Sequence, residues 1–142
     1  MKILFITLMG FLFAPAVWLG NFDDAQKEAK TAHKLILVNF SGSDWCGPCI
    51  RLRKEILESN AFEDYAKEKL LLVRADFPRA KKNQLAKEQV KLNEGLADKY
   101  NKEGKFPFTL LLDENGKVLK TWDGYPNLSP DEFVKQVSSV NK

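Results

Sequence analysis

Apolar residues gather in short runs along the chain, separated by polar stretches with helical spacing. The run at 35–40 is almost continuously apolar and predicts a central strand covered on both faces. The run at 70–75 predicts a second strand. Two further runs, 108–112 and 118–122, flank Asp113-Glu114-Asn115-Gly116-Lys117, a sequence typical of a β-hairpin. The pattern indicates an α/β domain built on a central sheet.

Capping signals and apolar spacing predict helices between these strands. Asp23 and Gln26 form a capping pair that predicts a helix to about residue 34. Ser129-Pro130-Asp131-Glu132 combines an N-cap, a proline at the first helical position and a capping-box glutamate, and predicts the last helix. The other expected helices cover 46–58, 60–69 and 80–103.

The N-terminus has the pattern of an export signal. Met1-Lys2 precedes an apolar run at 3–13, and Ala14-Pro15-Ala16 follows with the small-x-small pattern of a signal-peptidase site. We therefore expect residues 1–16 to be a signal peptide that is cleaved near Ala16. The expected location is periplasmic or secreted.

The alternative is a membrane anchor that stays uncleaved. The segment 3–19 is short for a membrane span, and Pro15 interrupts it. After cleavage, residues 17–142 have a usual length for one domain with a real core. We expect that single domain to be a monomer.

The charges do not favour a nucleic-acid partner. The chain carries 22 basic and 19 acidic residues, for a net charge of +3, and the two signs are interspersed. Nucleic-acid binding requires a concentrated basic surface. We therefore expect the partners to be proteins.

Trp45-Cys46-Gly47-Pro48-Cys49 contains both cysteines of the chain. A cysteine at the start of a helix meets unpaired N–H groups that favour the thiolate, so Cys46 is the candidate nucleophile. Cys49 lies one turn further on the same face, where it is able to resolve a mixed disulfide. Pro48 is tolerated in the first turn, and Gly47 leaves room beside the sulfur. We expect no cofactor beyond this redox-active pair.

Less reactive interpretations of the cysteines are a zinc site, a structural disulfide and an inert buried pair. A zinc site needs about four ligands, and beyond the cysteines the chain offers His33, far upstream, so we expect no metal. A disulfide across so short a loop restricts the unfolded chain little. Outside the cytoplasm disulfides persist, so a reactive pair implies a redox partner that resets it.

Two further features lie downstream of the cysteine motif. Phe106-Pro107-Phe108-Thr109 opens the predicted hairpin, and Gly124 follows it. With Trp45-Cys46-Gly47-Pro48-Cys49 after a buried strand, these features resemble the thioredoxin family over about residues 22–142. The resemblance implies the thioredoxin fold, a central mixed β-sheet flanked by helices. The expected helix at 80–103 is an extension relative to that family.

The resemblance also implies roles for Phe106 and Pro107. The bond between them is expected to be cis, with Pro107 packed opposite the cysteines and the backbone of Phe106 pairing with a substrate peptide like an added strand. The alternative is an ordinary trans proline at a strand edge.

Four other positions complete the expected substrate-binding set. Gly47 and Pro48 lie between the cysteines. Gly124 resembles the glycine that lets a substrate backbone approach, although a plain turn glycine has the same appearance. Trp45 is expected either on the exposed face beside the cysteines or packed in the interior, because tryptophan serves both uses.

Two departures from the family pattern affect proton transfer. Asn39 stands where thioredoxins have a buried aspartate, and the following turn at 41–44 is one residue longer, as in a branch of exported thioredoxin-like proteins. An amide cannot titrate, so the Cys49 proton is expected to go to water or to Asp44. Asp44 would also oppose the charge of a Cys46 thiolate.

The leading hypothesis is a thiol–disulfide oxidoreductase that reduces disulfides of exported proteins. Its expected partners are those proteins and a membrane or soluble redox partner. The alternatives are a disulfide oxidase or isomerase, and a non-catalytic or chaperone-like module that holds extended peptides near Pro107. A peroxidase use of the thiolate has little support, because no arginine or threonine stands evidently beside Cys46.

Overall fold

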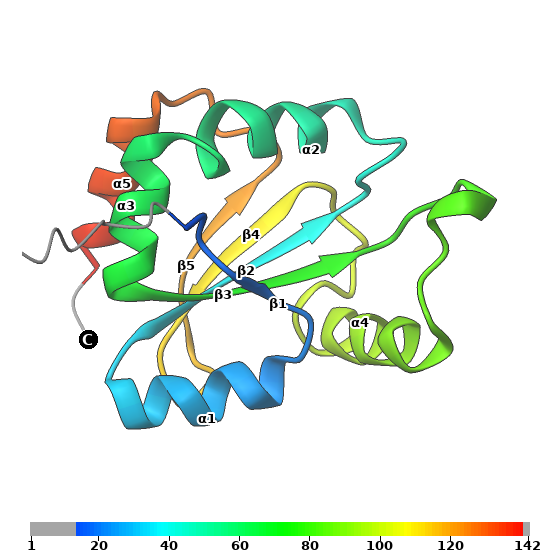
Figure 1. The fold of residues 1–142 in the computed structure, drawn as a ribbon, viewed down its shortest axis with the longest axis horizontal. Coiled ribbons are helices and arrows are strands. Elements are labelled where there is room, and N and C mark those ends of the chain that lie inside the picture. The colour runs from blue at the N-terminus through cyan, green and yellow to red at the C-terminus, as the bar shows by residue number, and fades with distance from the viewer. Residues whose placement is uncertain (1–13, 141–142) are drawn as a thin grey trace, which may run out of the picture.

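The computed structural model describes residues 14–140, which form a mixed five-stranded sheet between two layers of helices (Figure 1). Most of the expected signal peptide, residues 1–13, lies outside the described residues. Within the described part of the chain, no helix is long and apolar enough to cross a membrane. The strands are β1 Trp18–Leu19, β2 Leu35–Ser41, β3 Leu70–Asp76, β4 Phe108–Leu112 and β5 Val118–Asp123.

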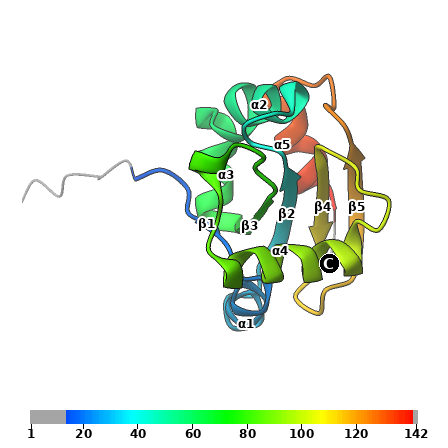
Figure 2. The same cartoon turned by 90° about the vertical axis from the view of Figure 1, so that its right-hand side faces the viewer.

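The helices cover the two faces of this sheet. They are α1 Phe22–Ala32, α2 Gly47–Leu52, the π-helical turn η1 Arg53–Leu57, α3 Asn60–Lys69, the 3₁₀ turn η2 Lys81–Asn83, α4 Lys87–Tyr100 and α5 Pro130–Ser138. Figure 2 shows α2, α3 and α5 on one side of the sheet and α1 and α4 on the other. Each side has its own apolar core, centred on Phe62 and Phe133 on the α2 side and on Phe40 and Ile36 on the α1 side.

The strand order is β1-β3-β2-β4-β5, so β2 lies at the centre. It runs parallel to β3 and antiparallel to β4, and all seven of its residues are buried. This confirms the prediction of a central strand from the continuous apolar run. The arrangement places the C-terminal end of β2, and the turn that follows it, at the start of α2.

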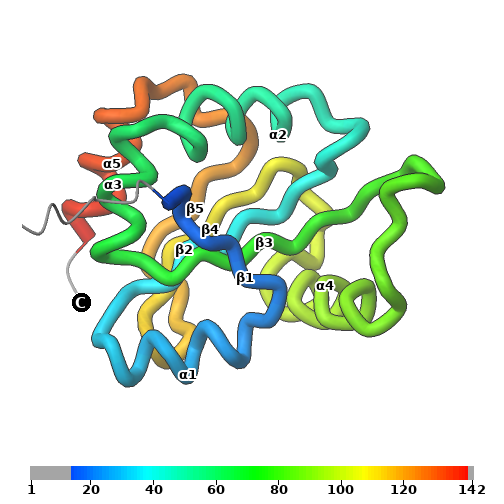
Figure 3. The backbone as a smooth tube through the Cα atoms, viewed as in Figure 1, coloured from blue at the N-terminus to red at the C-terminus, as the bar shows by residue number. Residues whose placement is uncertain are grey.

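Strand β1 was not predicted from the sequence. Trp18 and Leu19 pair in parallel register with Leu72 and Val73 of β3, and Figure 3 shows this segment running along the sheet edge before α1. Two residues carry too short a pattern to be recognised as a strand, because alternation needs at least about four positions.

The prediction of a helix at 80–103 is wrong at both ends, because α4 ends at Tyr100 and its first expected turns take another form. Residues 81–83 form a 3₁₀ turn, and α4 begins only at Lys87. The carboxylate of Asp44 accepts hydrogen bonds from the backbone N–H groups of Arg79 and Ala80 and from the Asn83 amide, so this segment is held in another conformation.

Two other helix predictions need smaller corrections. Asn21, rather than the pair Asp23 and Gln26, caps α1, because its side chain accepts hydrogen bonds from two N–H groups of the first turn. The helix expected at 46–58 changes to a π-helical turn at Arg53. The wider turn allows both Ile56 and Leu57 to be buried. The capping box at Ser129 is present as predicted.

Candidate active site

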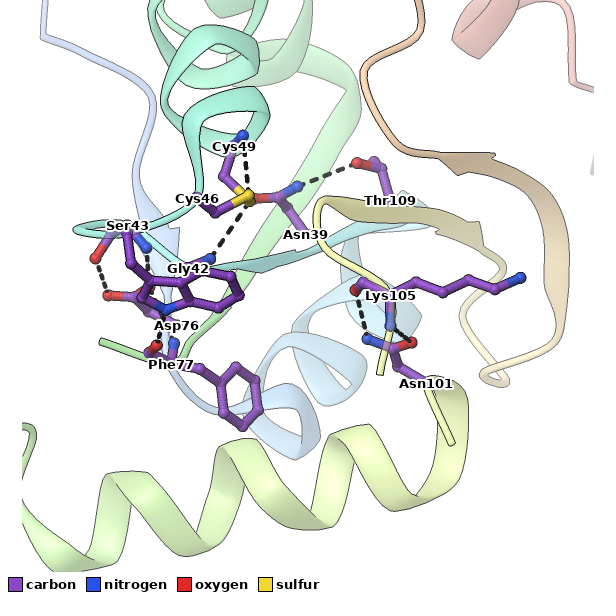
Figure 4. Close-up of a disulfide and its surroundings, with 11 residues drawn as sticks. Asn39, Gly42, Ser43, Cys46, Cys49, Asp76, Phe77, Asn101, Lys105 and Thr109 are labelled. Carbon is purple, nitrogen blue, oxygen red and sulfur yellow. Dashed lines mark hydrogen bonds between the residues drawn. A yellow bond between two sulfur atoms is a disulfide. The ribbon is translucent and has the colours of Figure 1, made fainter. Parts of the chain in front are cut away.

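Cys46 and Cys49 form a disulfide at the start of α2 (Figure 4). Cys46 is the N-cap residue, and its Sγ accepts a hydrogen bond from the backbone N–H of Cys49 at 3.3 Å. Sγ of Cys49 accepts one from the N–H of Gly42 at 3.5 Å. Cys46 is 6% exposed and Cys49 3%, so the more N-terminal sulfur belongs to the more accessible residue. The geometry matches a nucleophile that caps the helix and a partner thiol one turn behind it.

Trp45 forms a wall of the site and is packed rather than freely exposed. Its indole Nε1 donates a hydrogen bond to the carbonyl of Phe77 at 2.7 Å, and its ring meets Phe106 edge-on at 5.5 Å. The Arg79 guanidinium lies over the ring, 3.6 Å from the centroid. Gly42 lies against the indole so closely that a Cβ there would be 2.3 Å from it. Trp45 therefore combines the two uses expected from the sequence, because it is part of the site and is also well packed.

The expected substrate-binding residues of the second half of the chain meet at one place. The Phe106–Pro107 peptide bond is cis. The carbonyl of Pro107 accepts a hydrogen bond from the N–H of Gly124 at 2.9 Å, which brings these two distant positions together. Gly124 has a φ of +78°, and no atom lies within 4 Å of the place where its Cβ would be, so conformation rather than crowding favours glycine here.

Asn101 holds the segment that leads into this cis bond. Its side chain accepts a hydrogen bond from the N–H of Lys105 and donates one to the carbonyl of Lys105, each at 2.9 Å. Asn101 is buried, and Figure 4 shows its amide turned toward Lys105. Sequence reasoning missed this residue because the helix predicted at 80–103 placed it inside a helix, whereas α4 ends at Tyr100.

Asn39 occupies the buried position on the α2 side of the sheet where the family has an acid. It is 3% exposed, and its Nδ2 donates a hydrogen bond to Oγ1 of Thr109 at 3.1 Å. Thr109 faces it directly in the register of β2 and β4. The pair satisfies both buried polar groups without any charge, and Figure 4 shows the amide turned toward the threonine.

Of the two expected acceptors of the Cys49 proton, water and Asp44, the structure favours water, because Asp44 is engaged elsewhere. Both of its oxygens accept hydrogen bonds from the segment after β3. The donors are the backbone N–H groups of Arg79 and Ala80 and the side-chain amide of Asn83, each at 2.9 Å. These bonds, led by that from Arg79, lower the pKa of Asp44 below its ordinary value. The carboxylate therefore fastens a loop instead of serving the dithiol.

Asp76 makes a second link between the same two segments. Its carboxylate accepts hydrogen bonds from the N–H and the hydroxyl of Ser43, and the N–H of Phe77 donates to the carbonyl of Ser41 at 2.8 Å. The longer turn at 41–44 is therefore tied to the end of β3 from both sides. Sequence patterns did not indicate this role for Asp76.

A third network joins α2 to the segment that follows Gly124. The Arg51 guanidinium donates to Glu55 at 3.0 Å and lies over the ring of Tyr125, whose hydroxyl also donates to Glu55. The Tyr125 hydroxyl is the main cause that lowers the pKa of Glu55, and the bond raises the pKa of Tyr125. These contacts set the distance between the cysteine helix and the Gly124 turn.

Gly47, the residue after Cys46, leaves open space beside the dithiol. No atom lies within 4 Å of where a Cβ of Gly47 would be, so a partner is able to approach there. Within residues 14–140, no three histidine, cysteine or acidic side chains gather in a way that would hold a metal ion.

Comparisons with known proteins agree with this fold. A family model described as a thioredoxin-like domain matches residues 22–141. The chain therefore belongs to the thioredoxin family, and with its Cys46–Cys49 disulfide this supports the class of thiol–disulfide oxidoreductases.

Two sequence relatives and one solved structure show which members of that family the chain resembles. The disulfide bond reductase DsbH of Chlamydia pneumoniae is 37% identical over 122 residues, which cover 86% of this chain and 71% of DsbH. A solved structure named DsbH oxidoreductase superposes with a TM-score of 0.80 at 33% identity, covering 89% of this chain and 84% of that one. The thioredoxin-related protein DsbJ of Chlamydia pneumoniae is 41% identical over 61 residues, 43% of this chain and 18% of DsbJ.

Proposed function

We propose that this protein reduces disulfide bonds of exported proteins through the Cys46–Cys49 dithiol. The observation that carries the proposal is the placement of Cys46 as the N-cap of α2 with Cys49 one turn behind it. The reducing direction is supported by the Gly47-Pro48 pair between the cysteines, and by the printed name of the relative DsbH, a disulfide bond reductase.

The reaction takes place in two exchanges. In the reduced protein, the Cys46 thiolate attacks one sulfur of the substrate disulfide, forms a mixed disulfide and releases the other sulfur as a thiolate. The Cys49 thiolate then attacks Sγ of Cys46, which breaks the mixed disulfide and releases the second substrate thiol. The protein is left with the Cys46–Cys49 disulfide, and a dithiol partner must return two electrons to it.

Asn39 affects how Cys49 loses its proton. In place of a titratable acid, the position holds a neutral amide that donates to Thr109. Because Asp44 is occupied by residues 79–83, we infer that the proton leaves to water or to the departing substrate thiolate. Resolution by Cys49 should therefore be slower, relative to attack by Cys46, than in a protein with a buried acid.

The residues beside the dithiol suit an extended peptide. The cis Phe106–Pro107 bond and Gly124 lie next to one another through the hydrogen bond from Gly124 to Pro107. We propose that the backbone of Phe106 pairs with the substrate as an added strand, with Trp45, Gly47, Pro48, Pro107 and Gly124 around the reacting sulfurs.

We further propose that the protein works outside the cytoplasm. The export pattern of residues 1–16 supports this location. Disulfides persist there, so a redox partner must reset the pair for it to cycle. The names of the relatives DsbH and DsbJ are consistent with a system of several redox proteins. Mass spectrometry of the N-terminus of the protein isolated from its host tests cleavage near Ala16; an intact Met1 would contradict it.

Reduction of insulin by dithiothreitol tests the catalytic proposal. Wild type should accelerate the reaction, Cys46→Ala should abolish the acceleration, and Cys49→Ala should accumulate a mixed disulfide visible by mass spectrometry. Lys30→Gln, on the opposite side of the sheet, is the control and should behave as wild type. If wild type exchanges with no disulfide while Cys46→Ala still binds reduced peptides, the protein is a peptide-binding module instead.

Measurement of the reduction potential of the dithiol tests the direction. A value near that of thioredoxin, about −270 mV, fits a reductase. A value near that of a strong oxidant such as DsbA, about −120 mV, would contradict the reducing direction and favour an oxidase.

A further inference from the structure

The segment between β3 and α4 brings a concentrated positive charge to the rim of the dithiol site. Residues 79–87 contain Arg79, Lys81, Lys82 and Lys87 and no acidic residue. All four side chains belong to exposed residues. Figures 1 and 2 both show this segment beside the start of α2, where the disulfide lies.

Arg79 links this segment to the candidate site through a contact with Trp45. Its guanidinium lies 3.6 Å from the centroid of the Trp45 ring, and Trp45 is the residue before Cys46. The cation therefore packs on the residue that precedes the candidate nucleophile in the chain. The position is defined at the backbone as well, because the N–H of Arg79 donates to Asp44 at 2.9 Å.

Two nearby acids, Asp44 and Asp76, are engaged with the protein itself. Asp44 accepts its hydrogen bonds from residues 79–83, and Asp76 accepts from Ser43 and Phe77. Among the described residues, Arg79, Lys81 and Lys82 take part in no ion pair. The charged side chains that residues 79–87 expose to an incoming partner are therefore all basic.

We propose that Arg79, supported by Lys81 and Lys82, makes this protein select substrates with acidic residues beside the disulfide. The inference rests on the proposed function and names the substrate class of the same site. A carboxylate of the substrate would meet the guanidinium at the edge of Trp45 while the substrate sulfur meets Cys46. Charges that approach within the screening length of about 8 Å attract one another with only partial screening at physiological salt.

The test compares two synthetic peptide disulfides of identical length, one with glutamates and one with glutamines beside the cysteine. Acid-quenched mixing of the reduced protein with each peptide, followed by chromatography, measures the second-order rate constant of exchange. Wild type should react roughly threefold or more faster with the glutamate peptide in dilute buffer, and the preference should shrink in 0.5 M salt.

Three variants separate charge from packing. Arg79→Gln should lose most of the preference by slowing the glutamate peptide alone, and Arg79→Lys should retain it. Lys30→Gln removes one charge from the opposite side of the molecule and should leave the preference unchanged. Equal rates for the two peptides in wild type would overturn the inference, and so would an Arg79→Gln variant that slows both peptides equally. Exchange with neither peptide would overturn the proposed function and this inference with it.

Discussion

Asn39 shows how one uncharged side chain alters the chemistry of a dithiol site of the thioredoxin family. It is buried on the α2 side of the central strand and donates to Thr109. Its neighbour in the sheet register, Arg74, does not offer a counter-charge to this position, because its guanidinium lies over the ring of Trp18 at 4.2 Å. The protein therefore carries no buried acid at this point, and the energetic cost of one is avoided.

Replacement of Asn39 by aspartate should make stability fall as pH rises. Burial raises the pKa of the new carboxyl in the folded protein above its ordinary value of about 3.9. As pH rises, the unfolded chain therefore loses this proton at a lower pH than the folded protein does, and the unfolded state is favoured. The variant should lose about 1–3 kcal/mol relative to wild type at pH 7 and much less at pH 4. Urea unfolding of both proteins at the two pH values measures this. An equal difference at both would show that the new carboxyl is solvated.

Gly42 is needed by Trp45 rather than by the backbone of the turn. A Cβ at this position would lie 2.3 Å from the indole. Gly42→Ala should displace Trp45 from its hydrogen bond to Phe77, cost about 1–3 kcal/mol of stability and shift the tryptophan fluorescence. Gly47→Ala is the matched control, because nothing lies within 4 Å of its Cβ position. Similar unfolding curves for the two variants would argue against this account.

At the scale of elements, the segment between β3 and α4 is shaped by a carboxylate more than 30 residues upstream. Its apolar spacing predicts a helix from residue 80 onward, and the structure is helical from Lys87 to Tyr100. The first turns fail because the N–H groups of Arg79 and Ala80 donate to Asp44. The helix propensity of these residues is overridden because a charged carboxylate forms stronger hydrogen bonds with their N–H groups.

The Asp44 contact should open in acid. Its pKa is lowered chiefly by the hydrogen bond from Arg79, then by those from Asn83 and Ala80, so the contact favours the folded loop fully above the ordinary pKa near 3.8. It should be lost as pH falls below that value and through the lower folded one. Hydrogen exchange and NMR shifts of the Arg79 and Ala80 amides report the opening. Asp44→Ala should expose both amides at every pH, whereas Asp98→Ala, an exposed acid of α4, should leave them protected.

At the scale of the whole molecule, the edge of the sheet depends on residues that directly follow the expected signal peptide. Trp18 pairs with Leu72 and receives the Arg74 guanidinium on its ring, and burial is the main cause that lowers the pKa of Arg74. The strand begins two positions after Ala16. A chain cleaved at Ala16 would therefore keep its complete sheet.

Truncation should separate these two segments. Removal of residues 1–16 should leave thermal and urea unfolding unchanged, because β1 remains. Removal of residues 1–19 should cost about 2 kcal/mol, since the apolar surface of Trp18 and Leu19 leaves the edge of the sheet. Equal stability of the two truncated proteins would mean that β1 contributes nothing to the fold.

The sequence by itself determined the class of fold and the position of the dithiol. Strands β2, β3, β4 and β5 follow from apolar runs and a hairpin signal, which are local properties. The cysteine pair and its helix follow from spacing along a few residues. The resemblance to a known family added the cis bond at Pro107, which the structure contains.

The tertiary structure alone decided which distant groups meet around that dithiol. Asn39 finds Thr109 at a separation of 70 residues, and Asp44 finds Arg79 at a separation of 35. Strand β1 exists because β3 offers it an edge, and Arg79 reaches Trp45 because Asp44 holds its loop. No local sequence pattern predicts these contacts. A hydrogen bond between distant residues depends on how the sheet and helices pack, and the residues that flank each partner in the sequence do not indicate it.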